Sequence, residues 1–190
     1  MTTRAIATLL GAACIAAAHA QDAPIDAKPL PPATKRIAAS ADECAVWRRE
    51  HAFSHSVEGH DAQAFQSFLH AGTVFQAGTA EADRGSDTVT REWIGIIAGK
   101  TVALRWRPGI VQIGGEPGIA ISRGPYILQR TQAGVPSYRV GMFQTIWVRD
   151  VRDGVWRVLF DGSATTGQPI EDRAAAERWV ADQPMSDCAS

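Results

Sequence analysis

Two histidines four residues apart stand out in the stretch EHAFSH, which covers residues 50–55. His51 and His55 have the spacing at which one face of a helix can hold a metal ion, and Glu58 could supply a further ligand. In zinc proteases of the pattern H-E-x-x-H, the residue after the first histidine is a Glu that serves as general base. That residue is Ala52 here, so the stretch lacks the group that would activate water.

Helical geometry predicts the direction in which these histidines point. At about 100° per residue, Val46, Phe53 and Val57 cluster on one side of a helix and define its buried stripe. His51 and His55 fall on the opposite side. We therefore expect both imidazoles to face solvent, and we predict no metal site and no cofactor.

Glu50 is the neighbour of most chemical interest, because it lies only about 40° from the buried stripe. A buried carboxylate must be paired or have its pKa raised, and either state is useful in catalysis. Two placements remain open at this stage. Glu50 points into the interior of the protein, or it lies at the edge of the helix and pairs with an Arg of the sheet.

The helices that must position these residues are predicted from their capping signals. Ser40 with Glu43 three residues later is a capping box, and Asp61 and Ser86 are further N-cap candidates. The predicted helices run from Ser40 to about Glu58, from Asp61 and from Ser86, with a short strand over 73–78 between the last two.

After Gly99 the apolar period changes from helical to two, which is typical of strands. Short connections between the strands favour antiparallel pairing. A last helix is predicted from Pro169, with the proline in its first turn. The order of elements predicts an α+β domain in which helices cover one face of a strongly bent sheet. The four predicted strands cover residues 101–113, 118–131, 137–149 and 155–163.

The two ends of the chain differ in composition from its middle. Arg4, an apolar run and a small-x-small ending at Ala20 make the pattern of a secretory signal peptide cut after Ala20. We therefore predict a periplasmic or secreted protein. The predicted parts are a signal peptide (1–20), a proline-rich extended linker (21–39), the folded domain (40–168), and a C-terminal helix and tail (169–190).

Charge and cysteine content limit the partners. The formal net charge is −1, and removal of the signal peptide makes it one unit more negative, so no nucleic-acid partner is expected. No apolar run reaches the roughly 18 residues of a membrane helix, so no membrane span is predicted. Cys44 and Cys188 lie in a compartment that permits disulfides, and both the paired and the unpaired state remain open.

Three segments resemble the nuclear transport factor 2-like superfamily, and more narrowly its SnoaL-like and ketosteroid-isomerase-like members. They are EGHDAQAFQSFLHAGTVF (58–75), DRGSDTV (83–89) and FQTIWVRDVRDGVWRVLFDGS (143–163), and the resemblance covers residues 42–163. It implies a cone-shaped domain in which a curved antiparallel sheet packs on three N-terminal helices, with a C-terminal helix added. Since this fold houses both enzymes and binding proteins, it does not decide the function.

The resemblance also implies where catalytic groups would lie. In ketosteroid isomerases a Tyr on the first helix donates to the developing oxyanion, and an Asp after the first strand moves the proton. The matching positions here hold Phe53 and either Gln76 or Ala77. A phenyl ring cannot donate a proton and an amide is not basic near pH 7, so whether the chain is an enzyme stays open.

Further residues are candidates for a pocket between helices and sheet, where aromatic side chains form either a ligand-binding wall or plain core. The register of the last hairpin decides whether Gln144 or Thr145 points inward, and both registers remain open.

Asp161 is out of phase with Phe160 and is predicted to be a surface or rim acid unless the strand bulges. The predicted ligand-binding residues are Glu50, Phe53, Phe75, Gln76, Trp93, Trp106, Tyr126 and Gln144.

These features predict an exported protein that binds a small apolar or aromatic molecule inside a cone. One alternative is an isomerase, cyclase or dehydratase that acts on a small apolar substrate with Glu50 as acid or base. Another is a dimeric interaction module whose pocket is filled by its own side chains. A homodimer through the outer face of the sheet is the expected assembly.

Overall fold

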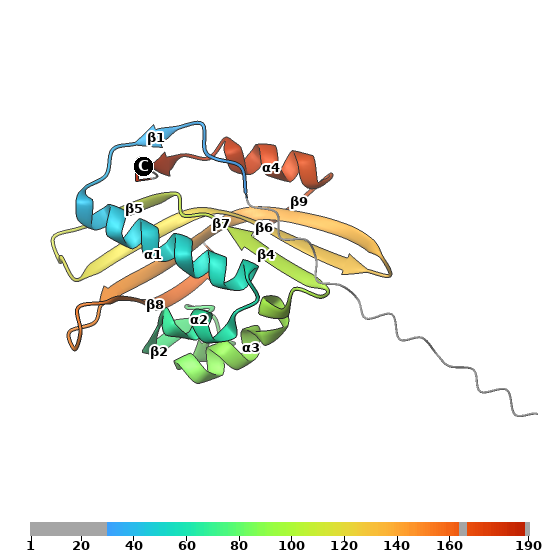
Figure 1. Cartoon of the computed structure of the whole chain (residues 1–190). Coiled ribbons are helices and arrows are strands. Elements are labelled where there is room, and N and C mark those ends of the chain that lie inside the picture. The colour runs from blue at the N-terminus through green and yellow to red at the C-terminus, as the bar shows by residue number, and fades with distance from the viewer. Residues whose placement is uncertain (1–29, 164–166, 189–190) are drawn as a thin grey trace, which may run out of the picture.

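The long strands of one curved sheet dominate the computed structural model, which describes residues 30–163 and 167–188 (Figure 1). The strand order is β3-β2-β8-β7-β6-β4, with β5 pairing with β6 and β9 pairing with β7. The predicted signal peptide and the first part of the predicted linker lie outside the described residues. The strands are β2 (Leu69–Phe75), β3 (Asp83–Arg84), β4 (Val102–Trp106), β5 (Ile110–Ile113), β6 (Ile119–Gln132), β7 (Val135–Arg149), β8 (Trp156–Ser163) and β9 (Gln168–Ile170).

The first three helices begin and end close to the predicted residues. Ser40 caps α1 with a reciprocal capping box to Glu43, and Asp61 caps α2 through the amide of Ala64. The third helix begins one residue earlier than expected, because Gly85 and not Ser86 is its N-cap. The helices are α1 (Ala41–Glu58), α2 (Ala62–Ser67), α3 (Ser86–Ala98) and α4 (Arg173–Ala181).

A long hairpin of β6 and β7 forms the centre of the sheet. Its two turn residues, Ala133 and Gly134, both have positive φ, at 49° and 78°. A two-residue turn of this kind matches the right-handed twist of the strands and fixes their register. The hairpin therefore stays in register from Gln132–Val135 at the turn to Ile119–Val148 at the far end.

Helices cover both faces of this hairpin. Tyr126 lies on the face turned toward α1 and α3, which we call the inner face. The next residue, Ile127, lies on the opposite, outer face, since alternate residues of a strand point to opposite sides. There Ile127 packs with Ala176 and Val180 of α4. The three N-terminal helices thus share the inner face as predicted, and α4 lies on the other side (Figure 1).

Three predicted elements differ from the structure. The strand predicted over 73–78 begins and ends earlier, as β2 (Leu69–Phe75). The strand predicted over 101–113 is broken at residues 107–109 into β4 and β5, where proline removes a ladder donor. Pro169, predicted in the first turn of a helix, lies in β9 instead. The helix α4 begins at Arg173, because the side chain of Asp172 accepts from the amide of Ala175 at 2.7 Å.

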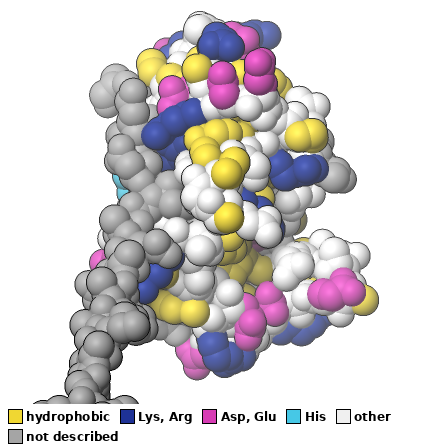
Figure 2. All heavy atoms as spheres, turned by 90° about the vertical axis from the view of Figure 1, so that its right-hand side faces the viewer, with side chains coloured by type: hydrophobic (Ala, Val, Ile, Leu, Met, Phe, Trp, Pro, Cys, Tyr) yellow, Lys and Arg dark blue, Asp and Glu magenta, His cyan; other side chains and the backbone are white. Residues whose placement is uncertain are grey.

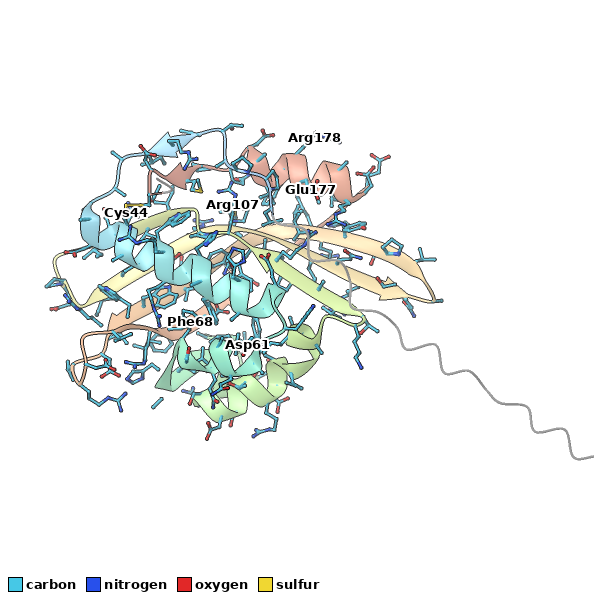
Figure 3. The ribbon with its side chains drawn as sticks, in the orientation of Figure 1. Cys44, Asp61, Phe68, Arg107, Glu177 and Arg178 are labelled. Atoms are coloured by element: carbon cyan, nitrogen blue, oxygen red, sulfur yellow. A yellow bond between two sulfur atoms is a disulfide. The ribbon has the colours of Figure 1, made fainter. Side chains whose placement is uncertain are left out.

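The segment 30–39, part of the predicted linker, is extended but lies against the end of the chain. Within it, β1 (Arg36–Ile37) pairs in parallel with β10 (Met185–Ser186). Ala33 is buried in the main core, which also includes residues of α1. A disulfide joins Cys44 of α1 to Cys188, with their Cα atoms 5.1 Å apart (Figure 3). The segment 30–39 is therefore bonded to the C-terminal segment, which the disulfide in turn fastens to α1.

Candidate functional site

A cavity of about 580 Å³ lies between the inner face of the sheet and the helices α1 and α3. Figure 2 shows a hollow on the side of the molecule that lies to the right in Figure 1, with apolar side chains inside it. Such a volume is large enough for a small organic molecule. Its lining residues are Phe53, Phe75, Gln76, Ala77, Thr79, Trp93, Ile96, Val102, Leu104, Trp106, Tyr126, Leu128, Arg130, Phe143, Asp161, Gly162 and Ser163.

The aromatic side chains of the lining contact one another and form a continuous wall. The ring of Trp93 lies 5.1 Å from that of Phe75 and 6.5 Å from that of Trp106. Trp106 in turn contacts Phe53 at 5.3 Å and Phe143 at 6.4 Å. Edge-to-face contacts at these distances favour one arrangement of the rings, so the wall offers a firm apolar surface for a ligand.

Tyr126 extends this wall across the hairpin, and a glycine makes room for it. A Cβ atom on Gly141 would lie only 2.6 Å from the Tyr126 hydroxyl oxygen. Gly141 is the direct partner of Tyr126 on β7. The absence of a side chain there lets the phenol ring lie close to the neighbouring strand, which is one reason for a glycine inside a strand.

Glu50 projects from α1 toward the sheet and is fully buried. The indole N–H of Trp106 donates to its Oε1 atom and that of Trp147 donates to its Oε2 atom, both at 2.8 Å. The structure thus selects the interior placement and not an ion pair at the helix edge. Burial raises the pKa of Glu50, while these two indoles and the nearby hydroxyls of Ser122 and Thr145 lower it in part.

A second carboxyl group, that of Asp161, lines the cavity next to Glu50. Asp161 pairs across the sheet with Thr145, whose hydroxyl lies 3.0 Å from the Oδ2 atom of Asp161. Thr145 pairs in turn with Ser122 on β6, so the three residues form one row on the inner face. The Thr145 hydroxyl therefore lies between the two carboxyl groups.

The environment of Asp161 favours its protonated form. Burial and, to a smaller extent, the charge of Glu50 raise the pKa of Asp161 to about 8, although the Thr145 hydroxyl opposes this shift. Two carboxyl groups this close do not both ionise readily, because each charge opposes the other. Near neutral pH, Asp161 can therefore donate a proton to a bound molecule, and its ionised fraction can accept one.

The inward position of Asp161 corrects the prediction of a surface or rim acid. Val158 and Phe160 pair with adjacent residues of β7, so Leu159 is an extra residue in β8. This bulge shifts the alternation of the strand by one position. Phe160 consequently points outward with 37% of its surface exposed, and Asp161 points into the cavity.

The prediction for Gln144 is wrong. Gln144 is exposed and pairs with Arg123 on the outer face, whereas Thr145 and Trp147 are buried on the inner face. The turn between β7 and β8 runs from Asp150 to Val155, and it gives the register that places Thr145 inward. Among the other predicted residues, Phe53, Phe75, Gln76, Trp93, Trp106 and Tyr126 line the cavity, and Glu50 lies behind its wall.

The two histidines of α1 are exposed, as helical geometry predicts. The ring of His51 stacks on Trp47 at 5.2 Å and contacts His55 at 4.4 Å. Within residues 30–163 and 167–188, no three His, Cys, Asp or Glu side chains gather as metal ligands. In the same part of the chain, no helix has the length and hydropathy needed to cross a membrane.

The bent sheet, the three helices on its inner face and the hollow between them define the nuclear transport factor 2-like cone. The fold expected from the sequence is confirmed by comparison with solved structures. Neither a protein-family model nor a curated protein sequence matches the chain.

Three solved structures illustrate the likeness. A nuclear transport factor 2-like superfamily protein from Salmonella enterica has a TM-score of 0.54 at 16% identity, over 70% of this chain and 94% of that chain. A ketosteroid isomerase-like protein from Erwinia carotovora has a TM-score of 0.54 at 15% identity, over 67% and 100%. An NTF2-like protein from Novosphingobium aromaticivorans has a TM-score of 0.51 at 17% identity, over 72% and 87%. At these identities the likeness concerns the fold alone.

Proposed function

We propose that this chain is an exported protein that binds a small, mainly apolar molecule in the cone and exchanges a proton with it through Asp161. The observation that carries the proposal is a single cavity-lining carboxyl group with a raised pKa, set in an aromatic wall and linked through Thr145 to a buried second carboxyl group. A titratable group of this kind in a cleft is a candidate for acid–base chemistry.

The size and lining of the cavity support the binding part of the proposal. The cavity holds about 580 Å³ of space, so its own side chains do not fill it. This volume argues against the alternative of an interaction module with a filled pocket. Burial of one aromatic ring against Phe75, Trp93 and Trp106 removes apolar surface from water on both partners, and that is the main source of affinity.

The polar residues of the lining indicate the kind of ligand. Gln76, Tyr126 and Arg130 bring N–H and O–H donors to the same cavity as the Asp161 carboxyl group. A carbonyl oxygen of the ligand could accept from such a donor while Asp161 acts on a neighbouring carbon. A small ketone therefore suits the site, and isomerisation or dehydration is the reaction type that such a site supports.

The proton transfer can be written with all atoms accounted for. The C–H bond next to the carbonyl group breaks, its proton bonds to the ionised Asp161 carboxylate, and the electron pair of the C–H bond forms an enolate. Return of a proton from Asp161 to carbon restores the ketone or gives its isomer. In this scheme Glu50 is a positioning residue, because it does not line the cavity and acts on Asp161 through Thr145.

Hydrogen exchange tests this proposal without knowledge of the natural substrate. The full chain is incubated in D₂O with a panel of small alicyclic and aromatic ketones, and deuterium at the carbon next to the carbonyl group is measured by mass spectrometry. We expect the parent protein to accelerate exchange for at least one ketone. Asp161→Asn should lower that rate by roughly 100-fold or more, because an amide cannot replace the acid–base group.

Binding of a neutral apolar dye, N-phenyl-1-naphthylamine, is the control for the cone itself. The dye should bind the parent and Asp161→Asn with similar affinity, since the aromatic wall is unchanged. If the dye binds but the protein accelerates exchange for no ketone, the proposal of ligand binding stands and the proposal of proton transfer by Asp161 is wrong. If the dye does not bind the parent at all, the whole proposal fails.

A homodimer through the outer face of the sheet is also part of the proposal. On this face Ile121 pairs with Ile146, and Ile146 pairs with Phe160, so apolar side chains lie side by side across three strands. Ile119, Ile121 and Phe160 are 44%, 43% and 37% exposed. Contiguous exposed apolar residues of this kind favour association, because contact with a second copy removes their apolar surface from water.

A further inference from the structure

A second, smaller pocket lies on the other side of α1 from the cone. It has a volume of about 240 Å³ and lies between the segment 30–36, α1 and the end of the chain. Trp106 belongs to the lining of both pockets and separates them. The lining residues are Leu30, Pro31, Pro32, Arg36, Trp47, His51, Ser54, His55, Glu58, Trp106, Arg107 and Met185.

Arg107 is the unusual member of this lining, because its guanidinium group is buried and only partly bonded. Its exposed fraction is 6%, and it lies between α1 and α4 (Figure 3). The Nη2 atom donates to the carbonyl oxygens of Val180 and Gln183 at 2.6 and 3.0 Å, at the C-terminal end of α4. Among the described residues, the Nε and Nη1 atoms of Arg107 have no hydrogen-bond partner.

The indole of Trp47 is a second buried group of this pocket with an N–H donor that no described residue satisfies. Trp47 is 7% exposed, lines the pocket and has a buried Nε1 atom without a hydrogen-bond partner among the described residues. Three buried N–H donors on two residues of one small pocket are therefore unsatisfied. Buried donors normally have partners, because an unpaired one loses its bonds to water without compensation.

The charged group nearest in effect to Arg107 is also a cation, so Arg107 lacks an anionic partner among the described residues as well as hydrogen-bond acceptors for its Nε and Nη1 atoms. The neighbouring charge that acts most on Arg107 is that of Arg36, another cation of the pocket lining, and burial together with this repulsion lowers the pKa of Arg107 to about 10. A buried cation is ordinarily paired with an anion. Here the pocket presents two cations and an indole N–H at one end.

His51 stacks on Trp47, whereas the carboxylate of Glu58 and the imidazole of His55 lie toward the other end of α1. Glu58 is eleven residues from Trp47, which corresponds to about 16 Å along a helix. Its carboxylate lies 3.9 Å from His55, and Arg105 acts on it as well. The charges that act on Glu58 are those of His55 and Arg105, and the charge that acts on Arg107 is that of Arg36, so Glu58 is not the partner of Arg107.

We propose that this pocket binds a small organic carboxylate, with its carboxylate group at the N–H donors of Arg107 and Trp47 and at the charge of Arg36. The remaining lining at this end is apolar, with Leu30, Pro31 and Met185, which suits an anion that carries a hydrocarbon body. A carboxylate forms short, charge-assisted hydrogen bonds with guanidinium groups. This site is separate from the cone, and it does not depend on the function proposed there.

Calorimetric titration of the full chain with benzoate tests the site. Trp47→Phe removes one N–H donor and keeps the ring, and Arg36→Gln removes an exposed cation at the rim. We expect each substitution to weaken benzoate binding about tenfold, since each removes one interaction with a charged group. Arg123→Gln makes the same change on the exposed outer face and should leave the affinity within about twofold.

Two further measurements distinguish benzoate binding at Arg107 from binding in the cone and from attraction of any anion. Benzoate should not displace N-phenyl-1-naphthylamine from the cone, and inorganic phosphate should bind more weakly than benzoate because it lacks an apolar body. The proposal is overturned if the parent shows no saturable benzoate binding, or if Trp47→Phe and Arg36→Gln bind as the parent does. Displacement of the dye by benzoate, or tighter binding of phosphate, contradicts it as well.

Discussion

At the scale of single residues, the chemistry proposed for the cone depends on two carboxyl groups that the sequence separates by more than a hundred positions. Glu50 is enclosed and bonded to two indoles, whereas Asp161 keeps contact with the cavity. The positions that the resemblance assigns to the catalytic groups of ketosteroid isomerases hold Phe53 and either Gln76 or Ala77, and all three residues line the same cavity. The proposed acid–base group thus comes from the last long strand and not from the end of β2.

Asp161 should make the stability of the protein depend on pH. Its pKa is about 8 in the folded state and lies near 3.8 without the fold, so the folded state holds a proton that the unfolded chain has lost. The stabilisation that this proton provides is complete below about pH 4 and is lost as the pH rises to about 8. We expect urea denaturation to show the parent losing stability relative to Asp161→Asn between pH 5 and pH 9.

The pKa of Glu50 is raised as well and its charge acts on Asp161, so the comparison of parent and Asp161→Asn reports on the coupled pair of carboxyl groups. A constant difference in unfolding free energy between parent and Asp161→Asn across this range would contradict the raised pKa.

The residues that can be predicted from sequence are those whose position depends on helical or strand phase alone. Phe53 and the two exposed histidines follow the 100° rule of α1, and the same rule brings Glu50 to the edge of the buried stripe. It cannot supply the two indoles that bond Glu50, because Trp106 and Trp147 come from other strands. The predictions for Gln144 and Asp161 are wrong because the phase of each depends on a turn and a bulge.

At the scale of elements, local signals and long-range pairing differ in what they predict. Capping boxes and turn residues are local, so α1, α2 and the hairpin of β6 and β7 agree with the sequence. The bulge in β8 is set by its pairing with strands on either side, and the break between β4 and β5 by pairing with β6. Such features require knowledge of the partner strand, which a single sequence does not provide.

The disulfide between α1 and the C-terminal segment should contribute strongly to stability. Cys44 and Cys188 are 144 residues apart, and closing a loop of that size restricts the unfolded chain. The loss of chain entropy corresponds to roughly 5 kcal/mol of unfolding free energy. We expect Cys44→Ser with Cys188→Ser to lower the unfolding free energy by about this amount in urea denaturation.

Reduction of the parent by dithiothreitol should reproduce the effect of the double substitution, and the same reductant should leave the double variant unchanged. Equal stability of the oxidised parent and the double variant would show that the crosslink does not constrain the unfolded state.

At the scale of the whole molecule, the two faces of the sheet have different roles. The inner face carries the cone, and the outer face is divided between α4 and the apolar residues around Ile121 and Phe160. This division is consistent with a protein that binds a ligand on one side and a second copy of itself on the other. If both proposals hold, ligand binding and dimerisation can therefore be altered separately.

Substitution of Ile121 by Glu should convert a dimer into a monomer in size-exclusion chromatography with light scattering. The charge would be buried without a partner in the proposed interface, while the isolated fold would tolerate it, since Ile121 is 43% exposed. Val135→Glu is the matched control, because Val135 is 68% exposed at the hairpin turn. A monomeric parent, or a dimeric Ile121→Glu variant, would exclude the outer face as the interface.

The bond between Cys44 and Cys188 also sets how the domain responds to mechanical force. A force applied between the two ends of the chain can extend only the segments outside the two cysteines while the bond is intact. The cone, the carboxyl pair and the outer face all lie inside that covalent ring. Such a force therefore does not act on the cone or on the outer face of the sheet until a reductant cleaves the disulfide.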